Sequence, residues 1–113
     1  MNILITGAGG FIGSHLSKLL ANEHNVFRVC SSLNTIETTN SFAVNLTNKL
    51  EVQKIFTDLS KQVHIDTILH LAGGMASPEQ TKDVELLQYN IAITENLINI
   101  TKILKPNVLI NFS

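Results

Sequence analysis

The amino-acid sequence predicts an α/β fold in which helices cover both faces of one parallel β-sheet. Short apolar runs alternate along the chain with longer segments whose apolar residues recur at helical spacing. A glycine-rich turn, Thr6–Gly10, also joins the first apolar run to the first helical segment. Because strands joined through helices run parallel with right-handed crossovers, we expect a doubly wound sheet of five strands in the order 3-2-1-4-5.

Composition limits the class of protein. The 113 residues allow one domain, and the net charge of −1, with scattered Lys and Arg, argues against binding to nucleic acid or an anionic membrane. The single cysteine, Cys30, excludes an internal disulfide and fits a reducing compartment. The apolar N-terminus lacks the basic segment of a signal peptide, and no apolar run is long enough to span a bilayer. We therefore expect a cytoplasmic protein.

The chain begins with a strand and a helix. Asn2–Thr6 is an apolar run bounded by glycine, which is the pattern of a buried parallel strand. A period of 3.6 residues then begins, and Asn22 lies near the expected end of this helix. The positions that recur at helical spacing are Phe11, Ile12, His15, Leu16, Leu19 and Leu20.

Two further strands precede the second helix. Val26–Cys30 and Phe42–Asn45 are short apolar runs, separated by a polar loop, Ser31–Ser41, with no clear period. Thr47 is the expected N-cap of the following helix. The expected face of that helix consists of Leu50, Ile55, Phe56 and Leu59.

The second half of the chain supplies the last two strands and the longest helix. Asp66–Leu71 reads as a strand that Gly73 and the next glycine terminate. Val84–Leu104 has helical spacing, and Pro106 helps to stop the helix. Asn107–Phe112 is the expected fifth strand.

The glycine-rich turn has the spacing of an anion-binding loop. Gly7, Gly10 and Gly13 follow the pattern G-x-x-G-x-x-G between a strand and a helix. Glycines there permit a tight turn and close approach of a ligand, and free N–H groups at the helix start can bind a pyrophosphate. The alternative is a turn that only lets the helix pack on the sheet. A nucleotide-binding P-loop is excluded because no Gly-Lys-Ser/Thr follows.

Four ordered motifs give the chain a wider resemblance. Ile5–Leu16 (ITGAGGFIGSHL) resembles the N-terminal fingerprint of the extended short-chain dehydrogenase/reductases, the NAD-dependent epimerase/dehydratase family. Asn45-Leu46 is similar to its Asp-Leu pair beside the adenine, and His70–Gly73 to its His-Leu-Ala-Ala segment against the ribose. Tyr89–Leu97 resembles its helix motif, Asn-Val-x-Gly-Thr-x-Asn-Leu. The resemblance implies that residues 1–113 are an incomplete NAD(P)-binding Rossmann domain.

The resemblance also implies roles for the matching positions. The glycines would cradle the pyrophosphate while the first helical residues offer backbone N–H groups, and an asparagine of the long helix would tie that helix to strand-end backbone. The implied cofactor-binding residues are Gly7, Gly10, Phe11, Ile12 and Gly13 at the pyrophosphate, Asn45 and Leu46 at the adenine, Leu71, Ala72 and Gly73 at the ribose, and Asn90 in the long helix.

The choice between NAD and NADP depends on the end of the second strand. NAD-preferring members usually carry an acidic residue there, whereas this chain has Cys30, Ser31 and Ser32. Ser31 or Ser32 could donate to a 2′-phosphate. Arg28 is near, but its position inside the strand leaves its direction open. We therefore expect NADP to be slightly favoured over NAD.

The catalytic residues of the resembling family are missing. Its proton-transfer Tyr belongs to a Tyr-x-x-x-Lys motif, but the only tyrosine here, Tyr89, is followed four residues later by Ile93. Val108–Ser113 is similar to the fifth strand of the family, and Ser113 aligns next to the expected catalytic hydroxyl. We expect a fragment truncated after strand five, without the substrate-binding part and inactive alone. A naturally short protein is the other possibility.

Two functions follow from the resemblance. In the first, the parent is a sugar-nucleotide epimerase/dehydratase or related reductase, an isomerase or oxidoreductase that transfers hydride through NAD(P). In the alternative, the chain is a non-catalytic dinucleotide-binding sensor or interaction module. Neither requires a metal, and His15, His24 and His64 lack metal-ligand spacing. We expect His70 to be a strand-end packing residue.

The long helix predicts a possible homodimer because it has two apolar stripes. The second stripe needs a partner, either a second copy through helix 84–104 or a C-terminal part of the same chain. The first stripe contains Leu86, Asn90, Ile93, Leu97, Ile100 and Leu104, and the second contains Val84, Leu87, Ile91 and Ile98.

Overall fold

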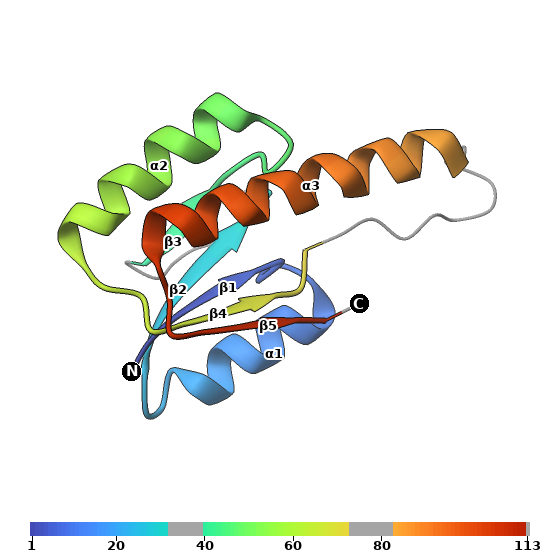
Figure 1. Ribbon diagram of the computed structural model, residues 1–113. Coiled ribbons are helices and arrows are strands. Elements are labelled where there is room, and N and C mark those ends of the chain that lie inside the picture. Colours follow the sequence, from blue (N-terminus) through green and yellow to red (C-terminus); the bar gives the residue numbers. More distant parts are fainter. Residues whose placement is uncertain (32–39, 73–82, 113) are drawn as a thin grey trace.

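A five-stranded parallel sheet organises the chain (Figure 1). The computed structural model describes residues 1–31, 40–72 and 83–112. The strand order is β3-β2-β1-β4-β5, and all four neighbouring pairs are parallel, so the predicted topology is confirmed. The strands are β1 (Asn2–Thr6), β2 (Asn25–Cys30), β3 (Ser41–Ala43), β4 (Thr67–His70) and β5 (Val108–Asn111).

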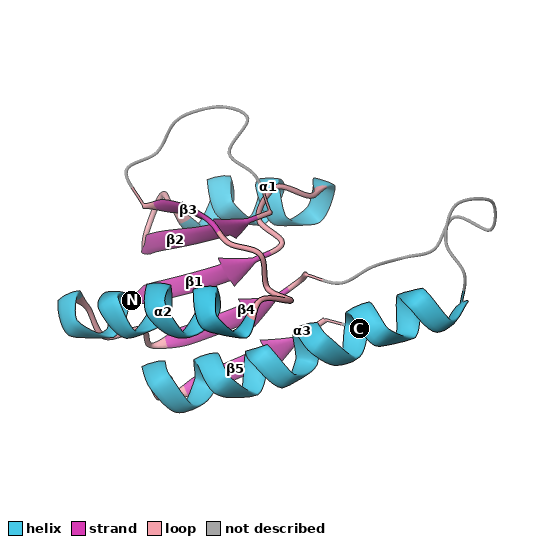
Figure 2. Ribbon diagram, turned by 90° about the horizontal axis from the view of Figure 1, so that it is seen from above, coloured by secondary structure: helices cyan, strands magenta, loops and turns pink. Residues whose placement is uncertain are grey.

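Helices cover both faces of this sheet, as a doubly wound fold requires. Figure 1 shows α1 (Phe11–Leu20) on one face, with α2 (Lys49–Gln62) and α3 (Asp83–Leu104) side by side on the other. The view from above in Figure 2 shows the same two helical layers, with α2 and α3 on one side of the sheet and α1 on the other. In the described residues, no helix combines the length and apolarity needed to cross a membrane.

The alternation of strand side chains divides the core in two. Leu4, Phe27, Val29 and Ile68 belong to the larger cluster, which also contains the buried residues of α2 and α3. Ile3, Ile5, Cys30 and Leu69 form the smaller cluster on the α1 face. Both faces of β1 are therefore buried, as expected of a central parallel strand.

The first helix packs differently from the expected face. Phe11, Ile12 and Leu19 are 80%, 61% and 67% exposed, whereas the buried positions are Gly13 and Ser17. The Ser17 hydroxyl donates to the Gly13 carbonyl oxygen at 2.7 Å, which satisfies it without a partner from the sheet. The expected apolar positions are therefore only partly right: Leu16 is half-buried and Leu20 packs against the smaller core cluster, whereas Phe11, Ile12 and Leu19 remain outside because the helix approaches the strands largely through its smallest side chains.

The second helix also corrects the expected cap and face. Its N-cap is Asn48, whose side-chain oxygen accepts a hydrogen bond from the Glu51 N–H at 3.1 Å. Thr47 instead donates to the Asn45 side chain, through its hydroxyl at 2.6 Å. Leu50 is 80% exposed, and the buried stripe of α2 is Val52, Phe56 and Leu59. Leu50 lies in the first turn, two positions before Val52, so it falls on the opposite side of the helix.

In the third helix, the prediction that the first apolar stripe is buried is confirmed for most of its residues. Ile93, Leu97, Ile100 and Leu104 are all buried. Leu86 and Asn90 are only half-buried, which corrects the expectation that they belong to the core. The reason is visible in Figure 1, where the N-terminal part of α3 extends past the edge of the sheet. The second stripe, Val84, Leu87, Ile91 and Ile98, is exposed.

Candidate functional site

The carboxyl ends of the strands bring the predicted ligand-binding segments to one edge. Thr6, the last residue of β1, pairs with Val29 of β2 and with His70 of β4. Cys30 pairs with Ala43 of β3. The glycine loop and the segments after β2, β3 and β4 therefore leave the sheet at the same edge, where ligands of doubly wound folds bind.

The glycine loop has backbone geometry that demands glycine at two positions. Gly7 has a φ of +69°, and a Cβ there would lie 2.7 Å from the Ala72 backbone nitrogen. A Cβ on Gly13 would overlap the Gly7 carbonyl oxygen and lie 2.9 Å from the Ala8 Cα. The loop after β1 is therefore in direct backbone contact with the segment after β4, and α1 lies directly against the loop.

Gly10 differs from these two glycines. A Cβ at Gly10 would meet only the Gly7 carbonyl oxygen, at 3.5 Å, which is an ordinary contact. Its backbone is extended, with φ −77° and ψ 176°, and its N–H donates to Gly7 at 3.1 Å. Packing within the described residues therefore does not require glycine here. The open space beside the Gly10 Cα is available to a ligand.

The start of α1 offers backbone donors beside this space. Among the described residues, the N–H groups of Phe11, Ile12 and Gly13 have no hydrogen-bond partner. No side chain caps the helix, and its first turn contains no acidic residue. Free N–H groups and the positive end of the helix dipole favour an anion at this position.

A buried hydroxyl connects β1 to the segment after β4. The Thr6 Oγ1 accepts hydrogen bonds from the Leu71 and Ala72 N–H groups at 3.1 and 3.2 Å. It lies 2.7 Å from the His70 Nδ1. Because two N–H groups already donate to this oxygen, its own proton goes to Nδ1, and the His70 imidazole is neutral with its proton on Nε2. This network holds Leu71 and Ala72 beside Gly7, and Thr6 was not predicted as part of the site.

The neutral state of His70 makes stability depend on pH. Burial lowers the pKa of the His70 imidazole from its usual value of about 6.5. A histidine with a lowered folded-state pKa contributes stability above the unfolded pKa, and that contribution is lost as the pH falls through the folded value. We expect urea unfolding to show lower stability at pH 5 than at pH 7.5. In a His70→Gln variant the pH difference should shrink, and an unchanged difference would assign it to other groups.

The adenine and ribose positions occupy different environments. Asn45 is exposed, and its side-chain oxygen accepts from the Thr47 N–H at 3.0 Å. Leu46 is buried in the larger core cluster, and its carbonyl oxygen accepts from the Asn96 side chain at 2.7 Å. Leu71 and Ala72 lie against Gly7, and each is half-buried.

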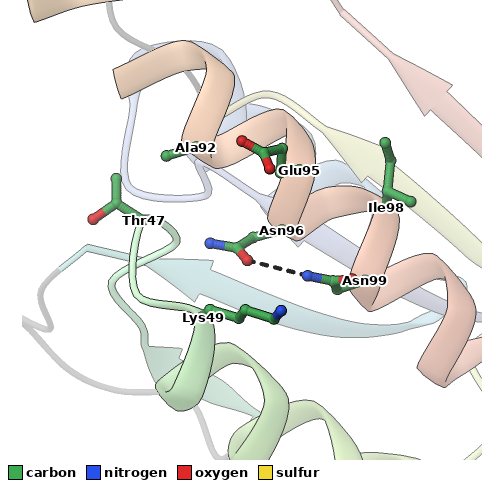
Figure 3. Close-up of a pocket in the computed structure, with 7 residues that line it drawn as sticks. All are labelled: Thr47, Lys49, Ala92, Glu95, Asn96, Ile98 and Asn99. Carbon is green, nitrogen blue, oxygen red and sulfur yellow. Dashed lines mark hydrogen bonds between the residues drawn. The ribbon is translucent and has the colours of Figure 1, made fainter. Parts of the chain in front are cut away.

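Asn96 is a buried polar residue to which the sequence analysis gave no role. It is 4% exposed, and its side chain fixes the segment after β3 through Leu46. Figure 3 shows its side-chain oxygen accepting from the Asn99 amide, a distance of 3.3 Å. These residues line an open groove of about 390 Å³ between the start of α2 and α3, with Thr47, Lys49, Ala92, Glu95 and Ile98. The signal for Asn96 was its position beside Leu97 in the buried stripe.

The structure shows in which direction the Arg28 side chain points, which the sequence left open. Its Nη2 donates to the Ala8 carbonyl oxygen at 3.3 Å, so the side chain turns toward the glycine loop. Ser31 is exposed immediately after the strand. Cys30 is buried, and its Sγ lies 3.6 Å from where a Gly9 Cβ would be.

Several predicted positions are not placed. Ser32, Gly73 and Ser113 lie outside the described residues, so their roles stay predictions. The role of Asn90 also stays a prediction. In residues 1–31, 40–72 and 83–112, no three His, Cys, Asp or Glu side chains are grouped closely enough to hold a metal ion.

The sequence was compared with models of known protein families. Residues 3–113 match the model of the NAD dependent epimerase/dehydratase family. The chain belongs to this family. The resemblance carried by the glycine loop and the later motifs is thereby confirmed, and so is the fold it implied.

Solved structures of related folds extend this result. L-threonine dehydrogenase from Clostridium difficile is 30% identical, with a TM-score of 0.75 over 95% of this chain and 34% of its own. UDP-glucose 4-epimerase from Bifidobacterium longum, in complex with NAD+ and UDP, is 22% identical and has a TM-score of 0.78. The match covers 100% of this chain and 37% of the epimerase. The chain thus spans about a third of these proteins. No curated protein matches the chain.

Proposed function

We propose that this chain is the NAD(P)-binding part of a nucleotide-sugar epimerase/dehydratase or a related reductase. The observation that carries the proposal is the glycine loop, where free N–H groups of α1 adjoin the open space at Gly10. Membership of an NAD-dependent family supports a nicotinamide dinucleotide as the ligand. The nucleotide-sugar substrate is supported by a structural relative that holds NAD+ and UDP.

Each described residue then has a task in binding. The N–H groups of Phe11 and Ile12 donate to the pyrophosphate, which approaches through the space at Gly10. Thr6 holds Leu71 and Ala72 in place for the ribose, and Asn45 lies beside the adenine. Bound NAD(P) supplies a nicotinamide ring that accepts and returns hydride.

Catalysis requires residues beyond those in this sequence. No Tyr-x-x-x-Lys motif is present, so we expect cofactor binding without turnover from the chain alone. The alternative, a non-catalytic sensor or interaction module, shares the binding site and differs only in the absence of chemistry. Epimerase or reductase activity from this chain alone would contradict the expectation. We propose a cytoplasmic location for either function.

Calorimetric titration with NAD+ and NADP+ tests the binding proposal. We expect saturable binding with one site per chain. A Gly10→Ala variant should bind about tenfold more weakly, because its methyl group enters the ligand space, while its thermal midpoint stays close to that of the parent. The matched control is Lys54→Ala on the exposed side of α2, which should bind normally. No binding of either dinucleotide would reject the proposal.

We also propose that the exposed stripe of α3 joins two copies of the chain. Val84, Leu87, Ile91 and Ile98 are between 47% and 64% exposed, and contiguous apolar surface of this kind marks interaction sites. Light scattering at high micromolar concentration should give the dimer mass. Ile91→Glu should give the monomer, because it places a charge in the middle of the stripe. A monomeric mass for the parent chain would end this proposal.

A further inference from the structure

Thr6 and His70 form a buried polar pair at the carboxyl edge of the sheet. They are register partners on β1 and β4, and they are 0% and 5% exposed. The Thr6 Oγ1 lies 2.7 Å from the His70 Nδ1, and it also accepts from the Leu71 and Ala72 N–H groups at 3.1 and 3.2 Å. One oxygen atom therefore connects the imidazole with the segment that contacts Gly7.

The hydrogen bonds of this pair suit only one protonation state of His70. A hydroxyl group has one proton to donate and two lone pairs with which to accept. Two N–H groups already use both lone pairs of Thr6, so its proton goes to an unprotonated Nδ1. A protonated imidazole donates from both nitrogens. Thr6 would then face three donors with two lone pairs, and its own proton would have no acceptor.

The bond from the Ala72 N–H is the one that protonation of His70 would break. The Leu71 N–H also donates to the Thr6 main-chain carbonyl oxygen at 3.2 Å, so it keeps a partner. Among the described residues, the Ala72 N–H has no partner besides the Thr6 hydroxyl. The Ala72 nitrogen lies 2.7 Å from the position of a Cβ at Gly7, so its release would loosen the contact between the glycine loop and the segment after β4.

The charged groups around His70 lie elsewhere. On β5 its register partner is the neutral Asn111, and the parts of α2 and α3 that pack on this face of the sheet are apolar. Arg28 shares the opposite face with Cys30, and α1, which carries His15, also covers that face. The titratable side chains of α2 and α3 with described burial are the half-buried Glu51, which accepts from the Asn45 N–H, and the exposed Lys49, Lys54, Asp58, Lys61, Glu85, Tyr89, Glu95 and Lys102. Burial alone therefore lowers the pKa of the His70 imidazole.

We propose that the Thr6–His70 pair is a proton-operated latch, which frees the Ala72 backbone and releases the bound dinucleotide when His70 takes up a proton. The inference rests on the proposed dinucleotide-binding function, in which Leu71 and Ala72 lie against the ribose. Because the ligand needs this segment in place, it binds the form with neutral His70, and binding and protonation oppose each other. Affinity is therefore full above the His70 pKa of the free protein. It falls as the pH drops through that value, with one proton taken up for each dinucleotide released.

Calorimetric titration of the whole chain with NAD+ between pH 5 and pH 7.5 measures this linkage. NAD+ is the probe because it lacks the 2′-phosphate of NADP+, which itself titrates in this range. We expect the Kd to be at least about threefold higher at pH 5 than at pH 7.5. His70→Asn puts an amide oxygen near the place of Nδ1 and does not titrate, so its Kd should be the same at both pH values. The matched control, His64→Asn, removes an exposed histidine near the amino end of β4 and should keep the pH dependence of the parent.

Hydrogen exchange followed by NMR tests the latch without a ligand. The protection of the Ala72 amide, relative to an unstructured chain at the same pH, should fall between pH 7.5 and pH 5. In His70→Asn it should stay constant. The Val44 N–H donates to the Cys30 carbonyl oxygen at 2.9 Å, away from His70, so its protection is the internal reference and should change little.

The outcomes separate the latch from the function on which it rests. The same Kd at both pH values in the parent, or an unchanged pH dependence in His70→Asn, rejects the latch and leaves dinucleotide binding intact. An equal loss of protection at Ala72 and Val44 means that acid opens the whole domain, which also rejects the latch. This comparison within the parent decides the matter if His70→Asn does not fold. Absence of binding to both NAD+ and NADP+ at every pH overturns the proposed function and this inference together.

Discussion

Replacement of Gly13 with alanine should lower the free energy of unfolding by about 2 kcal/mol. The added Cβ would overlap the Gly7 carbonyl oxygen and press on the Ala8 Cα, so α1 must move away from the loop. Such overpacking costs about 3 kcal/mol, and the better helix propensity of alanine offsets about 1 kcal/mol of it. Urea unfolding followed by circular dichroism measures the difference directly.

Gly10→Ala is the matched control for this substitution. It adds the same methyl group three residues earlier, where the nearest atom, the Gly7 carbonyl oxygen, would be 3.5 Å away. We expect its stability to change by less than about 0.5 kcal/mol. Equal stabilities of the two variants would show that α1 can move away from the loop without cost, and would contradict the close packing at Gly13.

The substitution Thr6→Val should cost about 3 kcal/mol of stability, the largest effect we expect from one residue of the binding edge. Valine keeps the shape of threonine but removes the oxygen that accepts from Leu71 and Ala72 and donates to His70. Two polar groups, the Ala72 N–H and the His70 Nδ1, then lose their partner in a site where Thr6 itself is fully buried, whereas the Leu71 N–H keeps its bond to the Thr6 main-chain carbonyl oxygen at 3.2 Å. Chemical denaturation gives the cost, and hydrogen exchange at the Ala72 amide should become faster.

Thr6→Ser is the control, because serine restores the hydroxyl while losing the methyl group. We expect it to recover the slow exchange of the Ala72 amide, although not the whole stability, since the lost methyl group leaves a small cavity. If valine and serine variants exchange at the same rate, the hydroxyl does not hold the segment after β4.

Periodicity was sufficient to predict the sheet because buried parallel strands are continuously apolar. Asn2–Thr6 has the predicted bounds, and the order of all five strands follows from the alternation with helices. The face of α1 was not predictable in the same way. A pattern of large apolar residues assumes that size decides contact, whereas Gly13 and Ser17 make contact because they are small. The Asn48 cap was missed because Thr47 is equally suitable in composition, and only backbone conformation distinguishes them.

In the candidate site, too, some residues could be predicted from the sequence and others could not. Gly7 and Gly13 were predictable because backbone conformation and close approach leave a signature in the residue type. The functions of Thr6 and Asn96 depend on partners far away in sequence, Leu71 for one and Leu46 for the other. One sequence contains no spacing that reports such contacts. The direction of Arg28 likewise required the position of Ala8 relative to β2.

The contacts of the glycine loop also determine which mutations a second mutation can rescue. A side chain at Gly7 would strike main-chain atoms of Leu71 and Ala72, so no smaller residue at either position would restore the fit. Gly9 is different, because its neighbour is the side chain of Cys30. In a genetic selection for function, suppressors of Gly9 substitutions should therefore arise at position 30. Substitutions at Gly7 should revert only to glycine.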